Sequence, residues 1–595
     1  RFVDVLPTLT SPSEVTKHIK EYFNDLQGDG VDIAKVFNLS VGVGALAPGL
    51  MAKAIRKNVQ QMAKMFITGE DPKSALPILK KQRDNNICFT VDLLGEATLS
   101  EKEALDYHQR YTEIIKWLSK DAKSWATKDL LDSDALGEIP KVNVSVKLTS
   151  VYSQVNEKDW EGSVETLKDR LRSIFRLAIG KDVFINIDME SFHHKDMTFE
   201  VFKQLLLEEE FKSYPHFGIV LQAYLRDSYA DLQELIAFAD HRGTPFSVRL
   251  VKGAYWDYEN IVTSQKDWPI PVYTNKQESD ANYEQCAKLL LDHFPKIKVA
   301  LASHNVRSLA ASACYAEHIG LPKNAFEIQM LYGMADELKS AFVKKGYRVR
   351  EYATVGDLIP GMAYLVRRLL ENTSNESFLR SKFVEGAELE KLMTDPAVNL
   401  SVTTPEHNIE KDFHNEAPLD FTESEPRTKM QNALIEWKKK LGQTYPLYIQ
   451  NKPITTDKTL PRENPSKKDE IVGQVCLAGY VESEQALEAA KEAFPAWKAT
   501  PPEQRAELVD RLADLILRDR YELCALEVLE VGKTWSEADG DIIEAIDFCR
   551  YYAKEMRLLA QPQRIGKVLG ETSHYVYDPR GVSLVIAPWN FPLAI

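Results

Sequence analysis

Eight short strand-like runs in the middle of the chain alternate with stretches of helical periodicity, and this alternation restricts the fold more than any other feature. Helical patterns lie between the runs, for example at 164–179, 198–209, 229–240 and 282–293. Eight β-then-α units over about 290 residues predict a closed (β/α)8 barrel, and an open doubly wound sheet is the alternative. The runs are 87–94, 142–148, 183–189, 218–224, 246–252, 297–303, 326–331 and 348–355.

Changes in composition divide the rest of this α/β chain into further segments. Residues 1–85 read as helical, with apolar periodicity at 15–26 and 52–66, and precede the barrel at 86–385. A polar stretch at 386–445 is typical of a linker, and 446–595 combines hairpin-like runs with long amphipathic helices. The sequence starts at Arg1 and stops within an apolar run at Ile595, so we expect both ends to be cut from a longer chain.

Composition narrows the class of protein. A 44% hydrophobic content with 27% charged residues is typical of soluble globular domains, and the net charge of −14 argues against a nucleic-acid partner. No run approaches the roughly 18 apolar residues of a membrane span, so any membrane contact is expected to be peripheral. Six cysteines without paired spacing favour a reducing, cytoplasmic compartment.

Polar and charged residues follow the predicted strands, where barrels of this type place their active sites. Buried charges are costly unless they are paired, so a set at the mouths of several strands predicts a functional site. The alternative is that Lys147 and Asp188 form only a structural ion pair closing the barrel. The strand-end residues are Asp92, Glu96, Lys147, Asp188, Met189, Gln222, Arg249, Lys252, Ser303, His304, Gln329 and Tyr352.

Two strand ends carry weaker signals. In Lys252-Gly253-Ala254 the glycine lets a backbone N–H approach a ligand, and the lysine offers a positive charge to a phosphate. A tripeptide of this kind is common. His304, at the end of the sixth run, is on its own more typical of a structural histidine than of a ligand contact.

The segment after the eighth run gives the sharpest pattern. Tyr364, Arg367, Arg368 and Glu371 follow the i, i+3, i+4, i+7 spacing and share one helix face. Two neighbouring guanidinium groups can bind a carboxylate through charge-assisted hydrogen bonds. The alternative is a solvated stripe in which an arginine pairs with Glu371, but that leaves the neighbouring tyrosine unexplained. We therefore favour a carboxylate clamp.

The barrel region resembles the proline dehydrogenase family over about residues 60–385. The resemblance implies a flavin enzyme that oxidises L-proline. One departure is Thr354, where the family commonly has proline, and it leaves the shape of that loop open. The motifs are Arg249-Leu-Val-Lys-Gly-Ala-Tyr-Trp256, Tyr364-x-x-Arg367-Arg368-x-x-Glu371, Asp92-Leu-Leu-Gly-Glu96 and Ile187-Asp188.

The last 150 or so residues resemble the start of the aldehyde dehydrogenase family and its Rossmann-like domain. A chain that combines these two resemblances in this order is similar to the bifunctional proline utilisation A family. The opening residues 1–7 also resemble the segment that precedes the barrel in that family. The resemblance implies NAD as a second cofactor of the full-length protein. The motifs are Ala493-Phe-Pro-Ala-Trp497, Arg505-Ala506, Glu530-Val-Gly-Lys533 and Ala587-Pro-Trp-Asn590-Phe-Pro592.

The resemblance assigns roles within the barrel. Asp188, Arg249 and Lys147 are expected to be catalytic, with Asp188 and Lys147 as a buried pair, and Glu96 and Arg367 are expected to form a gate. Residues expected to hold FAD are Met189, Gln222, Arg249, Lys252, Gly253, Ala254, Trp256, Thr274, Ser303, His304 and Gln329. Residues expected to bind proline are Lys147, Tyr255, Tyr352, Tyr364, Arg367, Arg368 and Glu371.

The implied reaction is hydride transfer from C5 of proline to flavin N5, which yields pyrroline-5-carboxylate. The amine must first lose its proton, and Arg249 is expected to stabilise the negative charge that develops on the flavin. By family analogy a membrane quinone reoxidises the flavin at the inner membrane face. No metal is expected, and a homo-oligomer is compatible with the sequence.

The aldehyde dehydrogenase part is expected to be incomplete here. Asn590 matches the oxyanion donor, whereas the family's cysteine and glutamate lie further downstream. Cys476 mimics the nucleophile motif but precedes Asn590, so we interpret it as structural. If the natural chain continues, its second reaction is NAD-dependent oxidation of glutamate semialdehyde to glutamate.

Two rival functions use the same residues. The first rival is an enzyme of another class, a barrel lyase or a methylene-transferring flavoprotein, because the same fold can carry different functions. The second is a non-catalytic protein whose helical region binds DNA or a partner while the barrel senses proline. Nothing in residues 1–85 reads as a DNA-binding domain, and the acidic net charge disfavours that role.

Overall fold

The computed structural model describes most of the chain. The helices expected over 15–26 and 52–66 lie largely outside the described residues, as do most of the residues of the predicted 364–371 helix. The described residues are 9, 11, 13–15, 17–18, 53, 57, 64–95, 98–356, 364, 368, 393–399 and 413–594.

The chain divides into two compact units. The first consists of Arg1–Thr263 with Pro269–Val402, and the second of Ser264–Trp268 with Thr403–Ile595. Each unit is described separately below.

Eight parallel strands of the first unit form a closed barrel, as the sequence predicts. Each strand pairs with its neighbours in chain order, and the last strand pairs with the first from Arg350 opposite Cys88 to Val355 opposite Leu93. This pairing excludes the open sheet. The short strand β1 (Ile67–Gly69) pairs in parallel with the end of the last strand, with Ile67 opposite Thr354. The barrel strands are β2 (Cys88–Leu93), β5 (Val142–Val146), β6 (Val183–Ile187), β7 (Phe217–Gln222), β8 (Phe246–Val251), β9 (Ile297–Ala302), β10 (Phe326–Leu331) and β11 (Arg348–Val355).

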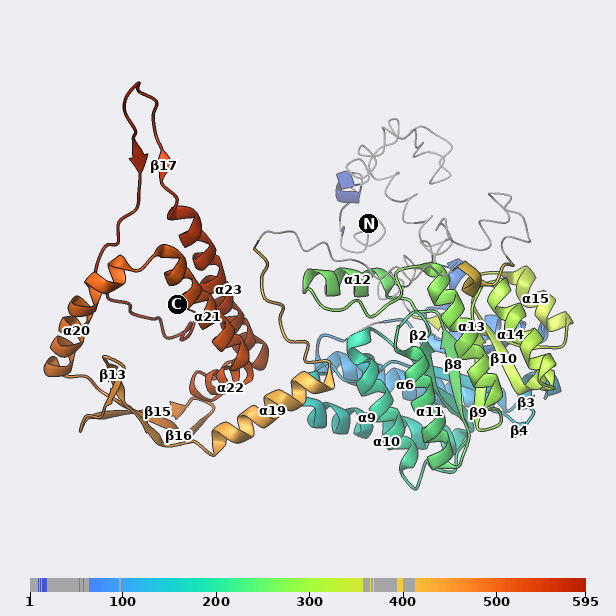
Figure 1. Ribbon diagram of the computed structural model, residues 1–595. Coiled ribbons are helices and arrows are strands. Elements are labelled where there is room, and N and C mark those ends of the chain that lie inside the picture. Colours follow the sequence, from blue (N-terminus) through green and yellow to red (C-terminus); the bar gives the residue numbers. More distant parts are fainter. Residues whose placement is uncertain are drawn as a thin grey trace. The chain divides into compact units, whose positions relative to one another are not determined.

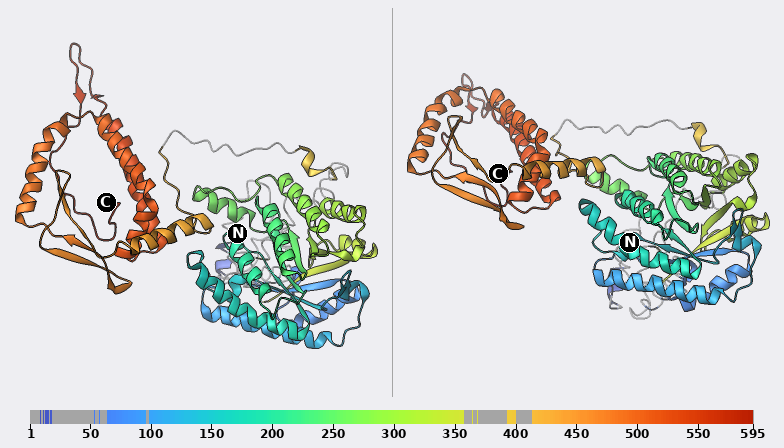
Figure 2. Two further views of the ribbon diagram at one scale, coloured as in Figure 1. Left: turned by 60° about the horizontal axis from the view of Figure 1, so that its bottom comes forward. Right: turned by 90° about the horizontal axis from the view of Figure 1, so that it is seen from below.

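Helices cover the outside of these strands (Figures 1 and 2). Because both faces of a barrel strand are covered, strands such as β5 and β7 are buried along their whole length, and β7 reads as a nearly continuous apolar run. Short helices α7 (Asp129–Asp132) and α8 (Leu148–Val151) and the ribbon β3–β4 (Ser133–Asp134, Gly137–Glu138) lie in the connections. The longer helices are α5 (Pro72–Asp84), α6 (Glu101–Ala122), α9 (Trp160–Lys181), α10 (Lys195–Leu207), α11 (Ser228–Arg242), α12 (Trp256–Gln265), α13 (Lys276–Asp292), α14 (Val306–His318) and α15 (Asp336–Lys344).

Local sequence signals set several helix ends. Asp71 forms a capping box with Ser74 at the start of α5, where Pro72 occupies the first turn. Asn275 caps α13 in the same way with Glu278. Gly243 ends α11 with a φ of 75°, a left-handed conformation that glycine adopts without steric cost.

A buried charge cluster lies at the end of the barrel where the strands begin. Glu327 on β10 accepts hydrogen bonds from Arg348 Nε at 3.0 Å and Arg350 Nε at 2.8 Å. Burial alone would raise the pKa of Glu327, but the two guanidinium groups outweigh burial and hold it well below its usual range. The cluster therefore joins β10 to β11 at the end of the barrel opposite the expected active site.

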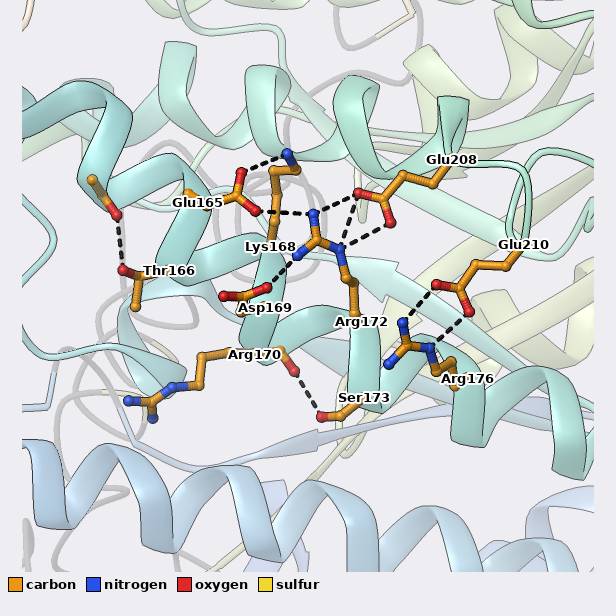
Figure 3. Close-up of polar contacts among 11 residues, drawn as sticks. Glu165, Thr166, Lys168, Asp169, Arg170, Arg172, Ser173, Arg176, Glu208 and Glu210 are labelled. Atoms are coloured by element: carbon orange, nitrogen blue, oxygen red, sulfur yellow. Dashed lines mark hydrogen bonds and ion pairs between the residues drawn. The ribbon is translucent and has the colours of Figure 1, made fainter.

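A second ion-pair network fastens α9 to the segment that follows α10 (Figure 3). Arg172 on α9 pairs with Glu208 at 2.8 Å and with Glu165 at 3.1 Å, and it also contacts Asp169. Arg176, one turn later, pairs with Glu210 at 2.7 Å. The Arg176–Glu210 pair is largely exposed, so water and salt screen it strongly.

Thr354, the departure from the family pattern, lies within β11 and is fully buried. Its hydroxyl donates to the carbonyl of Phe66 at 2.9 Å, and its carbonyl accepts from the hydroxyl of Thr68 at 2.7 Å. A proline has no hydroxyl to make the first of these bonds. Thr354 therefore ties the segment around β1 to the barrel.

The second unit contains helices and small sheets around its own apolar core. Helix α19 (Ser424–Lys438) lies within the stretch expected to be a linker, but its Met430 and Trp437 pack into that core. In Figure 1 the β17–β18 ribbon stands away from α23. The other elements are β12 (Gln443–Tyr445), β13 (Leu447–Ile449), β14 (Lys452–Ile454), β15 (Thr459–Asn464), β16 (Lys467–Cys476), α20 (Tyr480–Ala499), α21 (Pro502–Arg518), α22 (Arg520–Glu530), α23 (Trp535–Leu559), β17 (Gln563–Arg564) and β18 (His574–Tyr575).

Among the helices of the described ranges, none combines the length and the apolar character that crossing a membrane requires.

Replacement of Glu327 by glutamine should destabilise the barrel strongly. The change leaves two buried guanidinium groups without their counter-charge, which typically costs about 3–5 kcal/mol of unfolding free energy. Because Glu327 has a depressed pKa, its contribution is present at neutral pH and is lost as the pH falls. Urea unfolding of the barrel would measure the change.

Glu210→Gln is the matched control, because it removes a carboxylate from an exposed ion pair. Its expected cost is below about 1 kcal/mol. Equal costs for the two variants would contradict the structural role assigned to Glu327.

Candidate active site

A cavity of about 720 Å³ lies at the carboxyl ends of the barrel strands. That volume is within the range of small-molecule and cofactor sites. Residues at or just beyond the ends of all eight strands line the cavity, so barrel closure brings together side chains that are far apart in the sequence. The strand-end residues in its wall are Asp92, Lys147, Asp188, Gln222, Lys252, Ser303, Leu331 and Tyr352.

The residues expected to hold the cofactor all lie around this cavity. Their roles remain predictions, but their gathering in one place is a finding. His304 also accepts a hydrogen bond from the backbone N–H of Leu331 at 3.1 Å, so a structural contact accompanies its place in the wall. These residues are Met189, Gln222, Arg249, Lys252, Gly253, Ala254, Trp256, Thr274, Ser303, His304 and Gln329.

The expected substrate residues divide into two groups. Lys147, Tyr255, Tyr352, Tyr364 and Arg368 line the cavity, and the Arg368 guanidinium carbon lies 5.2 Å from the centre of the Tyr364 ring. The remaining expected residues lie outside the described part of the chain, so the gate and half of the clamp stay predictions. They are Glu96, Arg367 and Glu371.

The buried ion pairs differ from the expected one. Lys147 pairs with Asp92, whereas Asp188 accepts hydrogen bonds from Arg249 Nη1 at 2.7 Å and the Tyr352 hydroxyl at 2.6 Å. The prediction that Lys147 and Asp188 form a buried ion pair was therefore wrong. Strand β2 neighbours β5, which brings Asp92 to Lys147, while Arg249 and Tyr352 occupy the Asp188 carboxylate.

Burial and charge shift the titration of these groups. Burial raises the pKa of Asp92 to about 6, although the Lys147 ammonium opposes the shift. Burial would lower the pKa of Lys147, but the acidic groups around it, chiefly Asp92, together outweigh burial and raise that pKa. Burial and the charge of Asp188 raise the pKa of Tyr352 well above its ordinary value.

Arg249 is also held from the barrel interior. Its Nη2 donates to the Ser145 hydroxyl at 3.1 Å, and the Thr90 hydroxyl on β2 lies 3.3 Å from the same oxygen. Thr90 donates in turn to Asn143 at 2.7 Å. Polar side chains from β2 and β5 thus form a hydrogen-bonded chain that holds the Arg249 guanidinium from inside the barrel.

Gly253 is required by the conformation of the chain. Its φ is 135°, and a Cβ there would lie 2.4 Å from the ring of Tyr224. The backbone after Lys252 therefore passes directly over an aromatic ring, an approach that only glycine permits.

Sequence reasoning missed a group at the start of α13. Lys276, Ser279 and Asp280 line the cavity, together with Asn305, which caps α14. The predicted helix began six residues later, at 282. The Asn275-x-x-Glu278 capping box was the available signal.

The cavity walls fit a flavin. Within the described part of the chain, Gln222 Oε1, Gln329 Oε1 and Arg249 Nε are buried polar atoms without a hydrogen-bond partner. Such atoms are costly in a folded protein, so they point to a ligand that supplies both donors and acceptors. The edge of an isoalloxazine ring has both.

The second unit contains the residues considered for aldehyde chemistry. Asn590 is exposed, and Cys476 is buried on β16. Across the described ranges, no cluster of three or more His, Cys, Asp or Glu residues is arranged to hold a metal ion.

Three protein families match successive parts of the chain. The N-terminal domain of proline utilization A matches residues 1–66, proline dehydrogenase matches 75–381, and the aldehyde dehydrogenase family matches 453–595. The proline dehydrogenase match covers slightly more than half of the chain.

Relatives and solved structures agree with these matches. The bifunctional protein PutA of Escherichia coli is 32% identical over 576 residues, which cover 93% of this chain and 42% of that protein. A 1-pyrroline-5-carboxylate dehydrogenase of Bacillus pumilus is 47% identical over 183 residues, covering 31% of this chain and 36% of that enzyme.

The crystal structure of proline utilization A from Bdellovibrio bacteriovorus, inactivated by N-propargylglycine, is 56% identical with a TM-score of 0.91. The match covers all of this chain and 59% of that one. The chain thus spans less than half the length of the E. coli relative. The proline dehydrogenase match covers more than half of the chain and nearly all of the barrel, and the two other matches flank it in the sequence. The chain therefore belongs to the proline dehydrogenase family.

Proposed function

We propose that the barrel oxidises L-proline to pyrroline-5-carboxylate with FAD as its cofactor. The observation that carries the proposal is the cavity at the strand ends, whose wall contains the residues expected to hold the flavin and two residues of the predicted carboxylate clamp, Tyr364 and Arg368. The similar protein from B. bacteriovorus was inactivated by N-propargylglycine, an N-substituted amino acid. That inactivation supports an amino-acid site in the same fold.

Arg368 binds the substrate carboxylate in this proposal. Arg368 lines the cavity, and its guanidinium carbon lies 5.2 Å from the centre of the Tyr364 ring, a distance typical of a cation–π contact. Guanidinium–carboxylate hydrogen bonds are charge-assisted and directional, so they would fix the position of a small amino acid. The predicted partner of Arg368 in this clamp is Arg367.

The cavity favours the neutral form of the substrate amine. Each carboxylate among the described residues of its wall has a cationic partner: Asp92 has Lys147, Asp188 has Arg249, and Asp280 has Lys252. An ammonium group entering the cavity would lose water and meet carboxylates that are already compensated. Both effects shift the amine toward its unprotonated form, which can release a hydride.

Arg249 stabilises negative charge that develops during the reaction. Its guanidinium group is buried, and Asp188 and Ser145 hold it in place. A bound flavin supplies the hydride acceptor at its N5 position. A fixed cation in a site shielded from water favours a transition state that gains negative charge nearby.

The partners of the longer protein extend this proposal. We infer that a quinone at a membrane surface reoxidises the flavin, that the protein works in the cytoplasm or at the inner membrane face, and that it forms a homo-oligomer. The aldehyde dehydrogenase part would use NAD to oxidise glutamate semialdehyde, with Asn590 as oxyanion donor. The match to 1-pyrroline-5-carboxylate dehydrogenases supports this second activity.

Arg249→Met should slow flavin reduction by L-proline about 100- to 1000-fold, the loss that follows removal of one such stabilising group. Anaerobic stopped-flow absorbance of the flavin measures the rate. The control is Arg176→Met, which removes a surface guanidinium from α9 and should leave the rate unchanged. Reduction of the Arg249 variant at the wild-type rate would remove the proposed role.

Arg368→Met should weaken proline binding about 10- to 150-fold, because a charge-assisted hydrogen bond contributes roughly 1.5–3 kcal/mol. Pyrrolidine, which is proline without the carboxylate, should bind the variant and the wild type equally. A double-mutant cycle of protein and ligand measures this coupling. Equal losses for both ligands would show that Arg368 does not act on the carboxylate.

Asp92 should introduce an inflection near pH 6 in the rate of flavin reduction at saturating proline. Below that pH the carboxyl group is protonated and Lys147 loses its counter-charge, so the rate falls with decreasing pH. The Asp92→Asn variant should be slow throughout and lack this inflection. Persistence of the inflection in the variant would assign it to another group.

A further inference from the structure

Asp280 lies where three elements meet at the cavity. It is in the first turn of α13, where it pairs with Lys276 Nζ at 2.9 Å and with Lys252 at the end of β8. The side-chain amide of Asn305, which caps α14, donates to it at 3.2 Å. All four residues line the cavity. One carboxylate therefore holds three polar side chains of the wall.

The cluster carries a net positive charge. Asp280 is 9% exposed, and its charge compensates only one of the two lysines. Burial would raise the pKa of Asp280, but Lys252 and Lys276 outweigh burial and lower it. Burial lowers the pKa of Lys252, and the charge of Asp280 opposes that shift. The Asp280 carboxylate thus opposes the loss of a proton from Lys252 at the edge of the cavity.

A net positive wall suits an anion, whereas the carboxylate itself would repel one. Asp280 is therefore unsuited to direct contact with a phosphate, but it can fix the groups that make such contact. Lysine side chains lose considerable conformational freedom when a ligand orders them, and a partner that orders them beforehand reduces that cost. Asp280 provides this order for Lys252 and Lys276.

We propose that Asp280 is a positioning residue, which gathers Lys252, Lys276 and Asn305 into a preformed cradle for the phosphates of the flavin dinucleotide. The proposal rests on the proposed function, since it takes FAD to be the ligand of this cavity. Beyond that function, the inference assigns a role to Asp280, which would act on the cofactor through its lysine and asparagine partners and not by direct contact.

Reconstitution of the deflavinated full chain with FAD tests this role. The fluorescence of the flavin during titration gives the dissociation constant at pH 7 and pH 9. Asp280→Asn should raise this constant about tenfold or more, the loss expected when a charge-assisted hydrogen bond is removed. The increase should be larger at pH 9, because Lys252 without its counter-charge loses its proton more readily as the pH rises.

A double variant separates positioning from a general distortion. If Asp280 acts through Lys252, then adding Asp280→Asn to Lys252→Met should cost clearly less than the same change costs in the wild type. The full cost in both backgrounds would overturn the proposal. Tighter FAD binding by Asp280→Asn would also overturn it, since the carboxylate would then act only by repelling the phosphates.

Glu284→Gln is the matched control. Glu284 lies on the same helix, is buried and pairs with Arg307 at 3.2 Å, but it does not line the cavity. The charge of Glu284 also favours the charged form of Lys252, but less than that of Asp280 does. Glu284→Gln should therefore weaken FAD binding much less than Asp280→Asn, and an equal loss would show that Asp280 has no special role among the acids of α13. If the wild-type chain itself binds no FAD, the proposed function fails. If it binds FAD and L-proline reduces it, but Asp280→Asn binds FAD unchanged, only this inference fails.

Discussion

Pairing between the last barrel strand and the first is the contact on which the rest of the first unit depends. Strands β11 and β2 are separated by about 260 residues of chain, yet they pair in register from Arg350 opposite Cys88 to Val355 opposite Leu93. Without this pairing the strands would form an open sheet with two unpaired edges. Closure brings the ends of all eight strands around one cavity.

The chemistry of the cavity depends on how its charges are compensated. Buried carboxylates normally favour protonated amines, which would oppose hydride release from an amino acid. Here Asp92 and Asp188 already have Lys147 and Arg249 as partners, so the acids order the cations without presenting unpaired charge to a substrate. Asp280 does the same for Lys252 on the side proposed for the phosphates. Acid–base pairs of one design would thus serve both the substrate and the cofactor.

The sequence predicted the strands well because burial on both faces enriches them in apolar and β-branched residues. The predicted bounds of β10 and β11 match the structure, whereas β5 and β6 end two residues earlier than expected. Those extra residues include Lys147 and Asp188, which leave the strand ladder to enter the cavity. The strand ends were therefore misjudged where the chain begins to serve the site.

Other features needed information that a single sequence does not contain. The first turn of α13, from Lys276 to Asp280, is polar because it faces the cavity, so it lacks the apolar periodicity on which the prediction relied. The partner of Lys147 depends on which strands are neighbours and on competition for Asp188, and neither can be read from spacing. Helix α19 was taken for linker because it buries few of its residues.

Anaerobic titration of the purified flavin-loaded chain with L-proline tests the central claim most directly. If the strand-end cavity holds a flavin beside an amino-acid site, small additions of L-proline should bleach the flavin absorbance until all of it is reduced. A protein that purifies with flavin but stays oxidised in excess L-proline would contradict the account.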